Sequence, residues 1–301
     1  MRNLSTFLLL IVCFYGCSED SFSKIVEFDI EDEDQKLVVI SELITEVGDN
    51  HIVISKTTGV TSSSNRRFPY VVDADLQIVT PDVGNLQAEF VEVIDNTDPD
   101  NDVAGLYIIQ DYTFLPSETY TLQVKHPDFE DLSSTITTTS RPDVEVIEFR
   151  NNRLSEYQTE EFYTIRINDN PDEENHYRFD LFQTTFENGK DTIRNRESIW
   201  FDSNELVEGD INLLSDVSFQ NKSKTITLQA FDFITENTQI IKREVVVTSF
   251  NKELADYLQS VELLQQNENN PFVEPSILYT NIENGLGVFA IGISTVLEFE
   301  E

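Results

Sequence analysis

The chain has 301 residues and carries 56 acidic against 20 basic residues, for a formal net charge of −36 at pH 7. Nucleic-acid binding needs clustered lysines and arginines that replace counterions on phosphates. The sequence has no such cluster, so we expect no nucleic-acid partner. The same charge disfavours attachment to an anionic membrane through a polybasic patch. With 39% hydrophobic and 11% aromatic residues, the chain still has enough apolar material for packed cores.

Residues 1–16 have the pattern of an export signal. Arg2 supplies the positive charge, Leu4–Tyr15 the apolar run, and Gly16 the small residue before the cut. The run is shorter than the ~20 residues that a membrane-spanning helix needs, so a permanent span fits poorly. Cleavage would leave Cys17 at the N-terminus, a pattern that resembles a bacterial lipoprotein signal with an acylated cysteine. The alternative is an ordinary secretory signal that leaves Cys17 as a free thiol.

The residues that follow Cys17 are acidic. Ser18, Glu19 and Asp20 resemble the serine-plus-two-acids signal that carries Bacteroidota lipoproteins to the cell surface. This resemblance predicts a protein that is anchored in the outer membrane and faces the cell exterior. The alternative interpretation is a solvated acidic segment. We interpret residues 17–36 as a tether between the lipid and the first folded domain.

Residues 37–140 show the period-two hydrophobic pattern of β-strands, interrupted by turn-forming clusters. The expected strands are 37–44, 51–57, 74–79, 87–93, 105–111, 119–125 and 132–138. Seven short strands over roughly a hundred residues are typical of an immunoglobulin-like β-sandwich. The segment FLPSETYTLQV, residues 114–124, resembles the tyrosine corner of such domains. It predicts that the Tyr120 phenol bonds to the backbone across the turn.

Residues 141–301 are expected to form a second β-rich domain. The expected strands are 144–150, 161–168, 177–186, 192–201, 225–233, 240–249 and 288–297. Asn188 and Gly189 both tolerate positive φ, so 177–201 should be a long β-hairpin with a tight turn. The weaker pattern of 202–223 indicates an irregular connection.

One stretch of the second domain has helical periodicity. Leu254, Leu258 and Val261 recur at spacings of three and four and predict an amphipathic helix near 252–266. Asn251 is the expected N-terminal cap. An apolar stripe of this kind predicts packing against the second sheet.

The most distinctive stretch is NPFVEPSILYTNIENGLGVFAIG, residues 270–292. Together with KLVVISELI at 36–44, the tyrosine-corner segment and YLQSVELLQQ at 257–266, it resembles the Bacteroidota outer-membrane lipoprotein family catalogued as domain of unknown function 4249 (DUF4249). The resemblance spans nearly the whole chain after the signal. It implies β-sandwich domains, an outer-membrane lipid anchor, genes beside TonB-dependent outer-membrane receptors, and no established enzyme activity.

Two interpretations of the 270–292 motif stay open. In the first, Asn281 and Asn284 satisfy backbone groups inside turns, while Gly285 and Gly287 permit positive φ or close backbone approach. In the second, the motif forms a groove for a ligand or partner. The residues that would line this groove are Phe272, Tyr279, Asn281 and Glu283.

Motifs for catalysis or metal binding are scarce. The histidines, His51, His126 and His176, match no zinc or nucleophile-elbow motif, and the expected folded part has no cysteine. We therefore expect no enzyme activity and no cofactor. One acidic run could offer oxygen ligands to calcium, but it departs from the EF-hand pattern, and a solvated loop is the alternative. Its carboxylates are Asp98, Asp100 and Asp102.

A short modification pattern lies at the end of the predicted hairpin. Asp191-Thr192-Ile193 matches the acid-hydroxyl-apolar sequence on which Bacteroidota attach O-glycans to exported proteins. This match makes Thr192 a candidate glycosylation site and predicts that it is exposed.

The expected function is that of a non-enzymatic accessory lipoprotein that docks on or beside a TonB-dependent β-barrel receptor. The alternative is a module that binds an extracellular glycan, peptide or metal chelate. An exposed row of aromatics would favour this alternative, although aromatic residues are core residues first because they bury large areas. The candidates are Tyr157, Tyr163, Trp200 and Phe201. A hydrolase is the least favoured function.

Overall fold

The computed structural model describes residues 34–45, 50–58, 70–93, 104–156, 158–187, 192–201, 213–233, 238–267 and 277–299. Backbone contacts divide the chain into two units, and all strands below lie in the unit made of 35–58 and 65–301. Some sequence predictions fall outside the described residues. They are the signal at 1–16, Cys17, Ser18, Glu19, Asp20, Asp98, Asp100, Asp102, Tyr157, the Asn188-Gly189 turn and Phe272. Within the described residues, no helix is long and apolar enough to cross a membrane.

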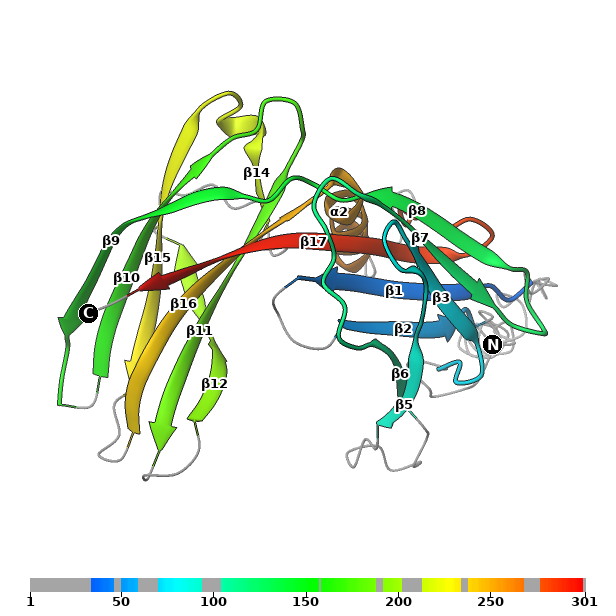
Figure 1. The fold of residues 1–301 in the computed structure, drawn as a ribbon, viewed down its shortest axis with the longest axis horizontal. Helices are drawn as coiled ribbons and strands as arrows, with labels where there is room; N and C mark the ends of the chain where they lie inside the picture. The colour runs from blue at the N-terminus through cyan, green and yellow to red at the C-terminus, as the bar shows by residue number, and fades with distance from the viewer. Residues whose placement is uncertain are drawn as a thin grey trace, which may run out of the picture. The chain divides into compact units, whose positions relative to one another are not determined.

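β-Strands dominate the described chain, which confirms the predicted mainly β class (Figure 1). They form three sheets. The largest has the order β12 (Thr192–Glu197), β11 (His176–Glu187), β16 (Thr238–Phe250), β17 (Leu286–Phe299), β1 (Leu37–Ile44), β2 (Asn50–Lys56), β6 (Ala104–Ile109), β5 (Glu89–Val93), with β14 (Leu214–Ser215) paired to β11. The second has the order β13 (Ile199–Phe201), β15 (Ser223–Phe233), β10 (Gln158–Asn168), β9 (Asp143–Arg153), and the third β4 (Gly84–Gln87), β3 (Asp75–Thr80), β7 (Thr119–Lys125), β8 (Leu132–Thr137).

The C-terminal strand β17 is shared by the early and late parts of the chain. Residues 286–292 pair in parallel with β1, and residues 293–299 pair antiparallel with β16 (Figure 1). Its sequence is a near-continuous apolar run, and most of its side chains are buried, as expected for a strand covered on both faces. Phe289 and Ile291 join one hydrophobic core and Phe299 another. The predicted domain boundary between 140 and 141 stays a prediction.

The first core is shared by the β17-β1-β2-β6 part of the largest sheet and the β4-β3-β7-β8 sheet. Alternate residues of β1 are buried, as the period-two pattern predicts, and Leu37 and Val39 are fully inside. Residues of β7 and β8 belong to the same cluster, including Leu122 and Ile136. The two sheets are therefore held by one continuous apolar layer.

The predicted tyrosine-corner contact is confirmed. Tyr120 opens β7 with its ring fully buried, and its phenol oxygen accepts a hydrogen bond from the backbone N–H of Leu115 at 2.7 Å. Phe114 packs edge-on against the same ring, with centroids 5.2 Å apart. The turn before β7 is thus tied to the strand that follows it.

The second core is shared by the β13-β15-β10-β9 sheet and the β11-β16 part of the largest sheet. The predicted hairpin is confirmed for β11 and β12, whose residues 181–186 pair with 192–197. The prediction of a single strand over 192–201 is wrong. The chain leaves the β11 sheet after Glu197, and β13 pairs with β15 of the second sheet instead. Ile199 and Phe201 then pack against the second core, which stabilises the change of sheet.

The predicted helix is confirmed as α2 (Lys252–Asn267). Leu254 and Ala255 are buried against Phe250 of β16 and Val288 of β17. The predicted cap is wrong, because the Oδ1 atom of Asn251 accepts no hydrogen bond. The Asn251 amide instead donates from Nδ2 to the Thr137 carbonyl at 3.5 Å.

Candidate functional site

A cavity of about 770 Å³ lies where β1, β11, the β12–β13 crossing and α2 meet. Its volume is within the ~300–1,000 Å³ that is usual for small-molecule sites. We call it the Trp200 pocket. Its lining consists of Glu42, Arg178, Phe179, Asp180, residues 196–201, Leu258, Val261, Glu262 and Gln265. The change of sheet at Ser198 is what turns Trp200 and Phe201 into a wall of this cavity.

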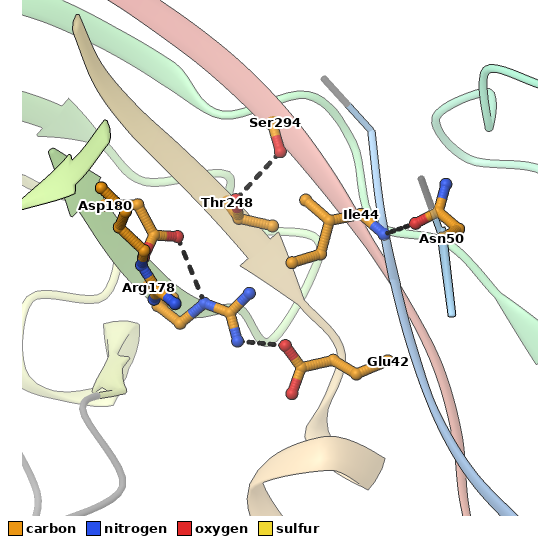
Figure 2. Close-up of polar contacts among 8 residues, drawn as sticks. Glu42, Ile44, Asn50, Arg178, Asp180, Thr248 and Ser294 are labelled. Atoms are coloured by element: carbon orange, nitrogen blue, oxygen red, sulfur yellow. Dashed lines mark hydrogen bonds and ion pairs between the residues drawn. The ribbon is translucent and has the colours of Figure 1, made fainter. Parts of the chain in front are cut away.

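An ion-pair network forms one side of the Trp200 pocket. Arg178 of β11 reaches to Glu42 of β1 and donates from Nη1 to Oε1 (Figure 2). Its Nε atom lies 3.5 Å from Oδ2 of Asp180, and Arg196 of β12 donates to Oδ1 of the same carboxylate. The network therefore connects three strands, with Asp180 held between two guanidinium groups.

Small polar residues occupy the strands between Arg178 and Glu42. Arg178 is paired with Thr248 of β16, whose hydroxyl lies 2.9 Å from that of Ser294 on β17 (Figure 2). Paired residues point to the same face of a sheet, so the Arg178 side chain passes over these short side chains to reach β1. Arg178 also stacks over the ring of Phe250 at 5.1 Å, which fixes the guanidinium further.

The Asp180 carboxylate is almost inaccessible. Its side chain is 2% exposed. The Oδ2 atom of Asp180 faces the Nε atom of Arg178, but neither atom has a hydrogen-bond partner among the described residues. A buried carboxylate is tolerated only where cations compensate it. Arg178 and Arg196 supply that compensation, so both arginines are committed to neighbours in this chain.

Aromatic residues form a second wall. Trp200 is 49% exposed and packs edge-on against Phe231 of β15, with ring centroids 5.4 Å apart. Phe201 is half-buried and packs edge-on against Phe179 at 5.7 Å. Trp200 therefore lines the cavity and keeps about half of its surface exposed, and binding sites commonly include such aromatic residues.

Helix α2 closes the cavity with a mixed surface. Leu258 and Val261 contribute apolar area, and Glu262 and Gln265 contribute polar groups. Glu197, at the end of β12, adds another carboxylate. The pocket can thus combine apolar contact, hydrogen bonding and charge, whereas the described residues show no group of three or more histidine, cysteine or acidic side chains arranged to hold a metal ion.

A family model described as domain of unknown function (DUF4249) matches residues 23–297, nearly the whole chain. The chain belongs to the DUF4249 family. No curated protein shows significant similarity to it. Because the family description assigns no activity, the functional interpretation of this DUF4249 protein depends on its own residues.

The described residues of the predicted C-terminal groove each contact the body of this DUF4249 protein. The Tyr279 backbone N–H donates to Ser260 Oγ at 3.0 Å, and burial raises the pKa of its phenol. Asn281 binds the backbone of Phe289 through both ends of its amide. Glu283 pairs with Ser133 through its backbone N–H and through its carboxylate, which accepts from the Ser133 hydroxyl at 2.8 Å. None of the three lines the Trp200 pocket. The ligand groove stays a prediction.

The other candidates lie in different surroundings. Thr192 begins β12 and is exposed, as its predicted glycosylation would require. Tyr163 is fully buried in the second core, where its phenol donates to Glu161. Trp200 and Phe201 are therefore the members of the predicted aromatic set that reach a cavity in the described part of this DUF4249 protein.

Sequence reasoning missed the ion-pair network of this DUF4249 protein. Arg178 and Asp180 alternate with apolar residues in the stretch YRFDLF of β11, and Glu42 interrupts the mostly apolar strand LVVISELI. Charged residues inside strongly apolar strands are a signal of buried pairing. That signal indicates that partners exist but does not identify them.

Proposed function

We propose that this DUF4249 protein is a lipid-anchored, non-enzymatic accessory of a TonB-dependent outer-membrane transporter, and that it captures an extracellular ligand in the Trp200 pocket. The proposal joins the anchor that the N-terminal sequence predicts with the cavity that the folded part contains. In it, Cys17 carries the lipid, and Ser18, Glu19 and Asp20 direct the protein to the cell exterior.

The pocket carries the binding part of this proposal. A 49% exposed tryptophan beside a cavity of about 770 Å³ offers contact area that no neighbouring side chain covers. Because Phe231 supports the ring and the ion pairs fix the opposite wall, little ordering is needed when a ligand binds. A preformed aromatic surface of this kind favours a binding role.

The accessory role rests on the lipoprotein signal and on the family resemblance. We further propose that residues 37–140 form an immunoglobulin-like sandwich, a fold common among cell-surface domains. The Tyr120 corner and the core shared by two sheets support this assignment.

Lipid attachment is tested by metabolic labelling with a clickable palmitate. The full-length protein should be labelled and recovered with the membrane fraction, and Cys17→Ser should abolish both. Cys13→Ser is the matched control, because the chain has two cysteines and Cys13 precedes the cut. Equal membrane recovery of the Cys17→Ser variant would contradict the anchor.

The transporter partnership is tested by affinity purification of the anchored protein in mild detergent, followed by mass spectrometry. A β-barrel receptor should be recovered repeatedly and in stoichiometric amounts. The second candidate function is a ligand-binding lipoprotein that acts without a transporter, which the exposed Trp200 favours equally. Binding in the pocket without any recovered β-barrel would establish this second function instead.

A further inference from the structure

The charges that line the Trp200 pocket are unequal. Its residues include four carboxylates and two guanidinium groups, and both guanidinium groups are already paired: Arg178 with Glu42 and Asp180, and Arg196 with Asp180. The carboxylates outside this network are Glu197 and Glu262. The pocket therefore has an excess of negative charge after its internal pairs are formed.

Glu197 and Glu262 have no cationic partner within the part of the chain that the structure describes. The contact found for Glu262 is a hydrogen bond from the neutral Gln266 amide, whose Nε2 lies 3.0 Å from Oε1. The two residues come from different elements, β12 and α2, so the pocket brings together carboxylates that are far apart in sequence. Each can accept a charge-assisted hydrogen bond from a ligand cation.

Trp200 supplies the second feature of a cation site. The face of an indole carries negative electrostatic potential and attracts ammonium and guanidinium groups. Elsewhere in this chain, arginines already cover aromatic rings, with Arg194 3.8 Å above Phe182. Among the described residues, no such cation lies over Trp200, although the ring is 49% exposed.

We propose that the Trp200 pocket binds a ligand through a cationic group, an ammonium or guanidinium such as that of a basic peptide side chain, held between the Trp200 face and the carboxylates of Glu197 and Glu262. This assignment rests on the binding role proposed above. The cavity is larger than one side chain requires, so the rest of the ligand contacts Phe201 and the apolar side of α2.

Alternative ligand classes fit the charges less well. A phosphate or carboxylate would meet guanidinium groups whose charges Glu42 and Asp180 already compensate, and it would enter a molecule with a net charge of −36. A neutral sugar could stack on Trp200 but would leave two carboxylates without a compensating charge. A cationic group can contact Trp200 and both carboxylates outside the ion-pair network, those of Glu197 and Glu262.

The experiment uses the chain's single tryptophan, Trp200, whose emission reports on the surroundings of its ring. The full-length protein in mild detergent is titrated with trilysine blocked at both termini. The comparison probes are the same peptide with acetylated lysines, blocked triglutamate, and maltotriose. We expect a saturable change in emission with trilysine, weakened by salt, and affinities at least about tenfold lower for the other three probes.

Variants separate the local carboxylates from the general charge of the protein. Glu197→Gln/Glu262→Gln should weaken trilysine binding by about tenfold. Glu145→Gln/Glu148→Gln is the matched control, since it removes the same charge from exposed positions on β9 outside the pocket and should leave the affinity unchanged. Trp200→Ala, followed by calorimetry because the emission is lost, should weaken binding by about tenfold. Circular dichroism verifies that each variant folds.

The outcomes distinguish this inference from the binding role on which it rests. Saturable binding of maltotriose or triglutamate without trilysine binding would overturn the cationic class and leave the pocket a binding site. Equal weakening by the two double variants would also overturn it, because the effect would then be one of overall charge. If none of the four probes changed Trp200 emission, both the cationic class and the binding role would fail.

Discussion

Asn281 holds the backbone of Phe289 with both ends of its side-chain amide. Nδ2 donates to the Phe289 carbonyl at 2.8 Å, and the Phe289 N–H donates to Oδ1 at 2.9 Å. The strand that contains Phe289 is paired with β1 on its other edge, where Ser41 is the partner residue. The amide thus replaces a neighbouring strand at this point. Its role here is structural, but the backbone groups that it binds belong to a strand and not to a turn.

Asn281→Ala should destabilise the fold. The substitution leaves the N–H and the carbonyl of Phe289 without partners, at a cost of about 1–3 kcal/mol for each group that water does not reach. Urea unfolding followed by circular dichroism measures the change. Asn152→Ala is the control, since its amide makes one long, exposed contact of 3.4 Å to Glu160. Similar losses of stability for both variants would contradict this structural role of the Asn281 amide.

Gly287→Ala should prevent the normal pairing of β17 with β1. Gly287 has φ of +108°, and a Cβ placed there would lie 1.9 Å from the Val39 carbonyl oxygen. Since this contact is with backbone, the strands would have to separate, and we expect a loss of more than about 3 kcal/mol. Gly84→Ala tests conformation alone: φ is +83° but nothing lies within 4 Å of the added carbon.

The measurement compares the thermal stability of the two glycine variants. Gly84→Ala should cost about 1–2 kcal/mol, the penalty for a left-handed backbone at a non-glycine residue. Thermal melts should therefore show a clearly larger drop for Gly287→Ala. If both variants melted at the same temperature, the close approach of the Val39 carbonyl to Gly287 would have no energetic importance.

Arg243→Met should be strongly destabilising because it leaves a buried charge. Nε and Nη2 of Arg243 contact Oε1 of Glu161 at 2.9 and 2.8 Å, and Glu161 is fully buried. Removal of one member of such a pair typically costs about 3–5 kcal/mol. The second change Glu161→Gln removes the orphaned charge and should restore part of the stability. A double variant no more stable than Arg243→Met would exclude charge burial as the cause.

The stability of the second core should depend on pH through Asp216. Burial raises the pKa of Asp216 to about 6. A hydrogen bond from the Asn175 N–H opposes this rise in pKa, and the neighbouring Asp169 carboxyl reinforces it. A carboxyl whose pKa is higher in the folded state binds its proton more tightly there. Its favourable contribution is complete below the unfolded value of about 3.9 and is lost as pH rises through about 6.

The measurement is the free energy of unfolding between about pH 4 and pH 8 for the normal chain and for Asp216→Asn. The stability of the normal chain relative to the variant should fall as pH rises from about 4 to about 6 and stay level above about pH 6. The amide is neutral throughout, and its oxygen can still accept from Asn175. A difference that stays constant over this range would show that Asp216 has an ordinary pKa in the folded protein.

Local patterns in the sequence determined most of the secondary structure. The predicted strands at 37–44 and 119–125 match β1 and β7 residue for residue, and the predicted helix differs from α2 by one residue. Period-two and period-3.6 patterns depend on neighbouring residues, so they can be read from the chain. The Tyr120 contact and the close approach at Gly287 follow from short motifs in the same way.

The tertiary structure decided which strands are partners and where the candidate site lies. β17 is apolar on both faces, and such a strand does not specify its neighbour, so its parallel pairing with β1 across about 250 residues of chain was not predictable. The transfer of Ile199–Phe201 to another sheet depends on packing against the second core. The pocket that contains Trp200, Arg178 and Glu42 forms as a consequence of these two long-range pairings. Because its residues come from distant segments, no single segment carries a sequence pattern that predicts the pocket.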